Sequence, residues 1–436
     1  MILRQPARTR DHRMTHPLLT RVRPWIGKSF WAIMDQGLFA FSNFLLNLCL
    51  ARWLAPESYG AFALAFTVFL FAGVLHSSIF TEPMLVFGSG KYRQSQQPYL
   101  STLVRFHWTR AWPILALLIA AVSVAYWDNP ARSSILFLAA TCSTTLYQWL
   151  MRRACYLSQQ PDLAASGGFL YLVTVLGGIA TLHQTRTLDA IPALAVMAGA
   201  SLLSGALIQF RLKRQRKLTS AGSSPDAEIL RAHWDYGRWA IATGVIGWFS
   251  GNIAMVSLPW WHGNEATGAF RAGLNLILPV QQLLAAAGPL LIPLLVRSRD
   301  LPQYRRITLT FAILFSAAPL AWALALGGVG PWICDWLYDG RYAFNRPVLI
   351  LLGLAAVFGS FGQVMAGALR AMELPNLAFR GYAASAVFSL ILGLPLIALG
   401  GILGASASLM AALAVSTAIH LRMVWKRTAN QARTPI

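Results

Sequence analysis

The sequence predicts an all-α polytopic membrane protein in which twelve transmembrane helices form two parallel six-helix lobes. Hydrophobic residues make up 56% of the 436 residues and charged residues only 12%, too few to cover a soluble protein of this size. Apolar runs long enough to cross about 30 Å of hydrocarbon as helices occur twelve times. The last six runs also repeat features of the first six.

The twelve predicted spans are 29–51, 59–80, 111–127, 133–151, 163–183, 189–210, 236–258, 268–296, 305–326, 346–369, 377–399 and 401–421. Residues 1–28 hold no separate apolar core ahead of a small-residue cleavage site, so the first span is predicted to stay as an anchor. Met14 is an alternative start to Met1.

The positive charges are distributed unevenly between the two sides of the predicted membrane. Thirty of the 36 Lys and Arg lie in or at the edges of the odd-numbered gaps between spans, counting the N-terminal tail as the first gap. Short loops rich in Lys and Arg stay on the cytoplasmic side, so both termini are predicted to be cytoplasmic. Topology therefore explains the net charge of +21, and we expect no nucleic-acid partner.

The two halves of the chain repeat each other at an offset of 208 residues. Trp31-Ala32-Ile33 matches Trp239-Ala240-Ile241, and Glu57-x-x-Gly60-Ala61-Phe62 matches Glu265-x-x-Gly268-Ala269-Phe270. Because six spans are an even number, both halves enter the membrane from the same face. Transporters with such parallel halves hold their substrate between them and rock one half against the other.

The repeat divides the chain into five predicted segments. These are a basic cytoplasmic tail at 1–28, an N-lobe at 29–210, a basic cytoplasmic linker at 211–235, a C-lobe at 236–421 and a cytoplasmic tail at 422–436. The Gly, Ser and Pro content of the linker is typical of a flexible connection.

The motifs of several enzyme classes are absent from the sequence. No phosphate-binding loop, nucleophile elbow or HExxH helix occurs, and the longest outer gap, about 327–345, is too short for a catalytic domain. The four cysteines, Cys49, Cys142, Cys155 and Cys334, form neither a disulfide framework nor a CxxC metal site. We therefore expect a protein that is no enzyme, with no metal or cofactor and with H⁺ or Na⁺ as the coupling ion.

Polar side chains follow one line along the first span. Gln36, Asn43 and Asn47 are spaced i, i+7 and i+11, within about 20° of one line on a helix, and Asp35 lies beside them. A carboxylate inside a membrane is costly, so Asp35 is predicted to face a cavity as a hydroxyl acceptor or proton carrier. The amides either line this cavity or join neighbouring helices as packing contacts.

A second polar line runs along the eighth span. Arg271, Asn275 and Gln282 are spaced i, i+4 and i+11 on one face. A guanidinium group has the fork geometry that holds a pair of phosphate oxygens, so these residues are predicted to bind substrate. The alternative is an arginine that reaches back to the outer interface.

Two more titratable residues lie in the inner half of the N-lobe. Glu82 ends the second predicted span together with Pro83, and His76 lies about a turn and a half earlier. Histidine titrates near neutral pH, so Glu82, His76 and Asp35 are predicted to share a site that couples transport to an ion gradient. A histidine that serves only as a bonded structural residue is the alternative.

The joint between the first two spans carries a family resemblance. Leu50–Leu64, with the run Pro56-Glu57-Ser58-Tyr59-Gly60-Ala61-Phe62-Ala63-Leu64, resembles the opening signature of the Wzx-type (RfbX-like) polysaccharide flippases of the MOP exporter superfamily, which also holds the MATE drug antiporters. The resemblance implies a MATE/MOP-like fold. It further implies flipping of undecaprenyl-diphosphate-linked oligosaccharide across the bacterial inner membrane, for O-antigen, capsule or exopolysaccharide biosynthesis.

The same resemblance suggests membrane lipids, a polysaccharide polymerase and a chain-length regulator as partners. Two other functions stay open at this point. One is a MATE-like cation-coupled exporter of small amphiphiles, which predicts an acidic or apolar cavity. The other is a membrane polysaccharide polymerase or ligase, which would need a large outer catalytic loop.

Overall fold

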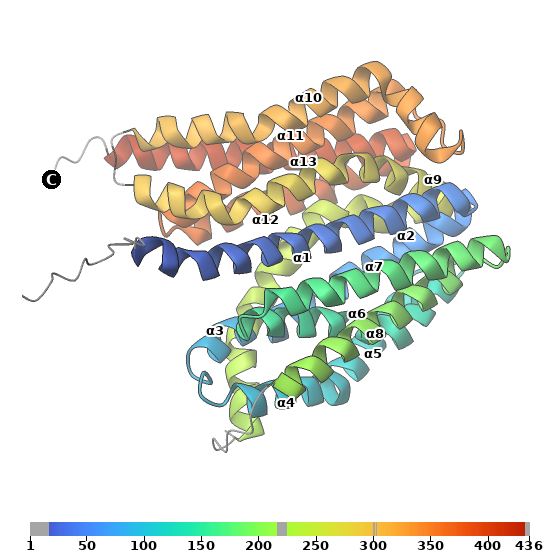
Figure 1. The fold of residues 1–436 in the computed structure, drawn as a ribbon. Helices are drawn as coiled ribbons and strands as arrows, with labels where there is room; N and C mark the ends of the chain where they lie inside the picture. The colour runs from blue at the N-terminus through green and yellow to red at the C-terminus, as the bar shows by residue number, and fades with distance from the viewer. Residues whose placement is uncertain (1–16, 216–224, 300, 302, 432–436) are drawn as a thin grey trace, which may run out of the picture.

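The computed structural model describes residues 17–215, 225–299, 301 and 303–431. The described chain is helical apart from short turns, as the sequence predicts (Figure 1). Its elements are α1 (Pro17–Trp53), α2 (Pro56–His76), η1 (Ser77–Thr81), α3 (Glu82–Ser89), α4 (Gln96–Phe106), η2 (His107–Ala111), α5 (Trp112–Val124), α6 (Ala131–Leu157), α7 (Pro161–Gln184), α8 (Ala190–Gln215), α9 (Asp226–Ser298), α10 (Tyr304–Tyr338), α11 (Arg346–Ala371), α12 (Pro375–Phe388), η3 (Ser389–Gly393) and α13 (Leu394–Gln431).

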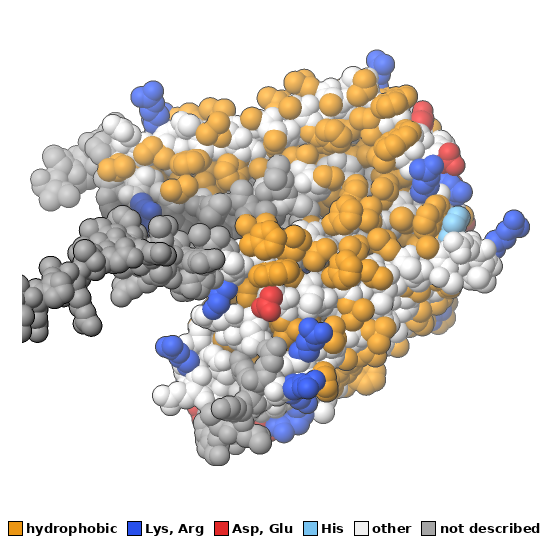
Figure 2. Space-filling view, in the orientation of Figure 1, with side chains coloured by type: hydrophobic (Ala, Val, Ile, Leu, Met, Phe, Trp, Pro, Cys, Tyr) orange, Lys and Arg blue, Asp and Glu red, His pale blue; other side chains and the backbone are white. Residues whose placement is uncertain are grey.

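These elements form the predicted twelve crossings of a membrane. Nine described helical segments are long and apolar enough to span one. Two of them, 226–282 and 376–428, turn back at Gly263 and Gly401, whose positive φ values of 73° and 54° suit glycine. Helix α6 crosses the bundle as well, and it is less apolar because polar side chains such as Gln148 and Arg152 lie on its buried face. Hydrophobic side chains cover the middle of the surface, and most Lys and Arg lie toward its two ends (Figure 2).

The two ends of the bundle differ in what they carry. The beginning of α1, the end of α8, the beginning of α9 and the end of α13 all lie at one end, here called the terminal end (Figure 1). The loops at 54–55, 125–130, 185–189 and 339–345 lie at the other, here called the opposite end. Helices α8 and α9 extend into the predicted linker from both sides, and residues 216–224 between them lie outside the described residues.

The second crossing continues past the point where the sequence predicted its end. Helix α2 passes through the π-helical turn η1 into α3, so Glu82 and Pro83 begin a further two turns of helix. Pro83 occupies the first turn after η1, where a missing backbone N–H is tolerated. The prediction that Glu82-Pro83 terminates this span was therefore wrong.

The third crossing begins earlier than its predicted start at 111. Helix α4, the π-helical turn η2 and α5 are continuous from Gln96 to Val124. Arg105 lies in this added part and forms an ion pair with Asp226 at the start of α9. The charged and polar residues of 96–110 lowered the local hydropathy, and their partners are distant in sequence, so the apolar pattern alone missed this part.

The internal repeat is visible in the packing of the two lobes. Gly60 on α2 and Gly268 on α9 are equivalent under the 208-residue offset, and their backbones touch. A methyl group built on Gly268 would lie 3.3 Å from the Gly60 Cα. The duplicated segments therefore meet each other across the interface between the lobes.

Candidate substrate cavity between the lobes

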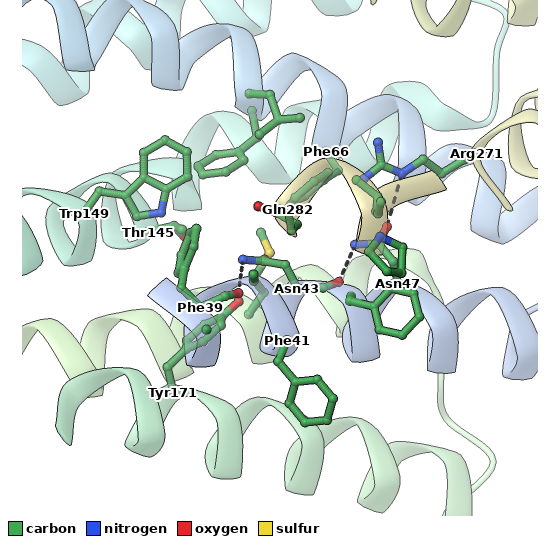
Figure 3. A pocket seen from close by; sticks show the side chains of 18 residues that line it. Phe39, Phe41, Asn43, Asn47, Phe66, Thr145, Trp149, Tyr171, Arg271 and Gln282 are labelled. Atoms are coloured by element: carbon green, nitrogen blue, oxygen red, sulfur yellow. Dashed lines mark hydrogen bonds between the residues drawn. The ribbon is translucent and has the colours of Figure 1, made fainter. Parts of the chain in front are cut away.

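A cavity of about 510 Å³ lies between the lobes, lined by α1, α2, α6, α7 and α8 of the N-lobe and by α9 (Figure 3). Much of its wall is aromatic, with rings from Phe39, Phe41, Phe44, Phe66, Phe69, Trp149 and Tyr171. Small residues such as Gly37 and Ala40 on α1 leave room between these rings. Helix α1 thus forms a wall that alternates large and small side chains.

The amide line on α1 faces the central cavity and a neighbouring one, as the helical spacing predicted. Asn43 and Asn47 line the central cavity, and Gln36 lines a second one nearer the terminal end. The Asn43 Nδ2 donates to the Phe39 carbonyl at 2.9 Å, and the Asn47 Nδ2 donates to the Asn43 carbonyl at 2.9 Å. These bonds to their own helix fix the two asparagines and leave their side-chain oxygens to accept from other groups.

Arg271 reaches the same cavity from α9 (Figure 3). Its Nε donates to the Asn47 Oδ1 at 3.3 Å, and its guanidinium carbon lies 5.3 Å from the centre of the Phe66 ring. The residue is only 8% exposed, and no described Asp or Glu forms an ion pair with it. A buried cation without a carboxylate is costly, so a residue of this kind by default marks a functional site.

The other two residues of the second polar line lie in different surroundings. Gln282 lines the central cavity with Arg271. Asn275 is buried away from it, where its Nδ2 donates to the Tyr59 hydroxyl at 2.8 Å and its Oδ1 has no partner among the described atoms. Asn275 therefore joins the two lobes, and the prediction that it faces the cavity was wrong.

Asp35 is fully buried in a bonded cluster, which corrects the prediction that it faces a cavity. The Arg152 Nε and Nη2 donate to its two carboxylate oxygens at 3.1 and 2.8 Å, and the Tyr156 hydroxyl donates at 2.7 Å. Such a bidentate pair satisfies and neutralises both charges. The groups that reach the cavity wall here are Arg152 and Tyr156.

Two further cavities continue from the central one toward the terminal end. One, of about 410 Å³, is lined by Gln36, Glu82, Arg152 and Arg153. The other, of about 690 Å³, is lined by parts of α2, η1 and α9 together with Glu82. Trp149 lines all three, so the cavities adjoin at this ring.

His76 lies apart from Glu82 and Asp35, so the predicted shared coupling site is not assembled. The buried His76 Nε2 bonds the His107 Nδ1 at 3.0 Å, and the His107 Nε2 bonds the Ser143 carbonyl at 3.1 Å. Because a carbonyl only accepts, the His107 Nε2 carries the proton and its Nδ1 accepts from His76. The His76 ring also stacks on Phe80 at 4.7 Å.

Sequence reasoning missed several residues of the site. Arg152 stands beside Arg153 at an odd-numbered, basic gap between predicted spans, and its ion pair with Asp35 joins residues 117 positions apart. Nothing in the sequence distinguishes Phe66, Trp149 and Tyr156 from the other aromatic residues of the chain. Only an estimate of which helices are neighbours would have brought them together.

Comparisons with known proteins support the fold. No protein-family profile and no curated protein matches the sequence. A solved MATE-family multidrug resistance transporter of the MOP superfamily, in an inward-facing conformation, aligns with a TM-score of 0.69 at 14% identity, covering 93% of this chain and all of that one. The lipid II flippase MurJ, in an inward closed conformation, aligns with a TM-score of 0.72 at 12% identity over 93% of this chain and 90% of MurJ.

This protein has the MATE and MurJ fold. A third similar structure, a MOP-superfamily transporter from Pyrococcus furiosus described as having a binding pocket of reversed polarity, aligns with a TM-score of 0.59 at 13% identity. It covers 93% of this chain and 95% of its own. At these identities the likeness shows the architecture, and the side chains of the cavity must supply the argument for a substrate.

Proposed function

We propose that this protein flips undecaprenyl-diphosphate-linked oligosaccharide across the bacterial inner membrane for surface polysaccharide biosynthesis. The observation that carries the proposal is Arg271, a buried guanidinium on the cavity wall without a described carboxylate partner. An anion entering the cavity would supply the missing counter-charge. A diphosphate offers the paired oxygens that a guanidinium fork binds best.

The rest of the cavity suits the sugars of such a substrate. The side-chain oxygen of Asn43 offers an acceptor for hydroxyl groups, and the amide of Gln282 offers both an acceptor and donors. The aromatic rings offer flat apolar faces, as in other binding sites built from rings and a few placed polar groups. In this proposal the polyprenyl chain stays in the lipid beside the lobes, and alternating access carries the head group across.

The rival function fits the same cavity less well. A MATE-like cation-coupled exporter of small amphiphiles predicts an acidic or apolar wall, whereas Arg271 is the only Asp, Glu, Lys or Arg among the described residues of the central cavity. The polymerase or ligase alternative gains no support from the similar structures, which are transporters and flippases.

The orientation, coupling and partners belong to the same proposal. The terminal end faces the cytoplasm, so the cavities that continue toward it would admit substrate from the inner leaflet. A proton or sodium gradient supplies the energy, and Glu82 is the first candidate for coupling because it lines two cavities while Asp35 is neutralised. A polymerase and a chain-length regulator would receive the flipped product.

The test is translocation in proteoliposomes that contain fluorescently labelled undecaprenyl-diphosphate oligosaccharide. We expect transport by the wild-type protein, a loss of about 100-fold in Arg271→Ala and a smaller loss in Arg271→Lys, because lysine keeps a point charge without the fork. A cationic amphiphile serves as the rival substrate. Export of the amphiphile with no movement of the labelled lipid, or full activity of Arg271→Ala at matched abundance, would contradict the proposal.

A further inference from the structure

The duplicated motif makes the same close contact twice where the lobes meet. A methyl group on Gly60 would lie 1.7 Å from the Asn264 carbonyl oxygen, and one on Gly268 would lie 2.5 Å from the Pro56 carbonyl oxygen. Pro56 and Asn264 are themselves equivalent at the 208-residue offset. Each half therefore presses its glycine onto the backbone of the other half, and any side chain at either glycine would force the two helices apart.

This contact lies between the central cavity and the opposite end. Pro56 directly follows the loop at 54–55, and Asn264 directly follows the turn at Gly263, both at the opposite end. Arg271, which lines the cavity, is about one helical turn from Gly268 in the direction of the terminal end. Two hydrogen bonds join the lobes on the same side of the cavity. The Arg341 Nη1 donates to the Leu54 carbonyl at 2.9 Å, and the Tyr126 hydroxyl donates to the Val256 carbonyl at 2.7 Å.

Tyr59 connects this contact to the cavity arginine. It directly precedes Gly60, and its buried hydroxyl accepts from the Asn275 Nδ2 and interacts with the Arg271 guanidinium. Arg271 is also tied across the interface by its long bond to Asn47. An anion that binds Arg271 would compete with both of these neighbours for its N–H groups.

We infer that the Gly60–Gly268 contact is the seal that closes the cavity at the opposite end, and that Tyr59 is a positioning residue through which an anionic head group at Arg271 releases this seal. The identity of the head group rests on the proposed function. The seal itself rests only on the packing, so the two parts can fail separately.

The first arm of the test measures the seal without any lipid substrate. A cysteine at Asn43, in a variant with the four native cysteines replaced by serine, reports from the cavity wall. A membrane-impermeant thiol reagent is applied to sealed vesicles of known orientation from the face of the opposite end. We expect Gly60→Ala and Gly268→Ala each to raise the labelling rate about tenfold, because the added methyl groups cannot be accommodated in the closed state.

Matched controls come from glycines with open surroundings. Gly177 and Gly199 have no atom within 4 Å of a built methyl group, so Gly177→Ala and Gly199→Ala should label at the wild-type rate. If the seal variants do not fold, Arg341→Ala removes one bond between the lobes without a backbone clash and should raise labelling by a few-fold. Labelling of the glycine variants at the control rate, or an effect at only one of the two glycines, would overturn the seal.

The second arm adds undecaprenyl diphosphate without a glycan. We expect this lipid to raise labelling of the reporter from the opposite end in the wild-type background. In Tyr59→Phe, which loses the inter-lobe bond from Asn275, the rate without lipid should already be raised by a few-fold, and the lipid should add no further increase. An equal response in Tyr59→Phe would overturn the role of Tyr59. A wild-type protein that does not respond at all would contradict the release by an anion and the proposed substrate, while the glycine result would still stand or fall by itself.

Discussion

Two buried arginines, one in each lobe, differ in one respect. Arg152 in the N-lobe and Arg271 in the C-lobe are each 8% exposed, and each lies over a phenylalanine ring, at 4.1 Å from Phe39 and 5.3 Å from Phe66. Arg152 is neutralised by Asp35, whereas no described carboxylate pairs with Arg271. The difference fits a first charge that holds helices together, and it supports the proposal that the second is kept for a ligand.

The largest effect is expected from breaking the neutralised pair. Asp35→Ala leaves the Arg152 guanidinium buried without its counter-charge, and we expect the free energy of unfolding to fall by about 3–5 kcal/mol. Thermal unfolding in detergent measures this loss. The double variant Asp35→Leu with Arg152→Met should recover most of it, and equal stability of the single variant and wild type would show that Asp35 is no structural partner.

Methionine substitutions of the two arginines should give the next largest effects on stability, and these effects should differ. Arg152→Met is expected to lower the melting temperature, because it leaves the Asp35 carboxylate unpaired. Arg271→Met should leave the free energy of unfolding unchanged or raise it by about 1–2 kcal/mol, since it removes an unpaired buried charge. The same detergent melts measure both variants. A stability loss at Arg271 as large as that at Arg152 would contradict the contrast.

A smaller effect is expected from the residue that orients Arg271. Asn47→Ala removes the acceptor of the Arg271 Nε and should reduce lipid-diphosphate transport about fivefold, in keeping with one long hydrogen bond of about 1 kcal/mol. Ser42 on the same helix is buried and bonds only its own backbone, at the Leu38 carbonyl, so Ser42→Ala is the matched control. Equal transport in the two variants would show that Asn47 does not orient Arg271.

The smallest change in transport is expected from a substitution at Glu82. Glu82→Gln should leave transport without an imposed gradient unchanged and should flatten its increase when a proton gradient is applied, because glutamine cannot titrate. His76→Gln is measured alongside as the second candidate for coupling. A normal gradient response in both variants would move coupling away from proton binding at these side chains.

The periodic features of the fold and cavity could be predicted from the sequence. Apolar run length gave the crossings, and the spacing of Gln36, Asn43 and Asn47 placed these amides on the cavity side of α1. Both depend only on helix geometry within one segment. The offset between the halves likewise predicted that Gly60 and Gly268 are equivalent.

Features that depend on a distant partner could not be predicted in this way. Asp35 looked like a cavity acid because the sequence does not show that Arg152, 117 residues away, reaches it. The early start of the third crossing lies in a polar stretch whose contacts, such as the ion pair of Arg105 with Asp226, are also between distant residues. The π-helical turn at Ser77–Thr81, which carries the second crossing past Glu82, leaves no periodic mark in five residues.

The mutual contact of Gly60 and Gly268 also bears on how such a chain arises. A contact in which each partner offers the same surface to the other is the isologous interface of a twofold homodimer. In a dimer of a six-helix ancestor, every substitution would have appeared on both sides of that axis. After fusion into one chain the copies became free to diverge, so an arginine stands at 271 where the first half has Ala63, and an aspartate at 35 where the second has Thr243. A duplicated and fused chain can thus carry an unpaired charge on one side of its cavity, which a symmetric dimer could have only in duplicate.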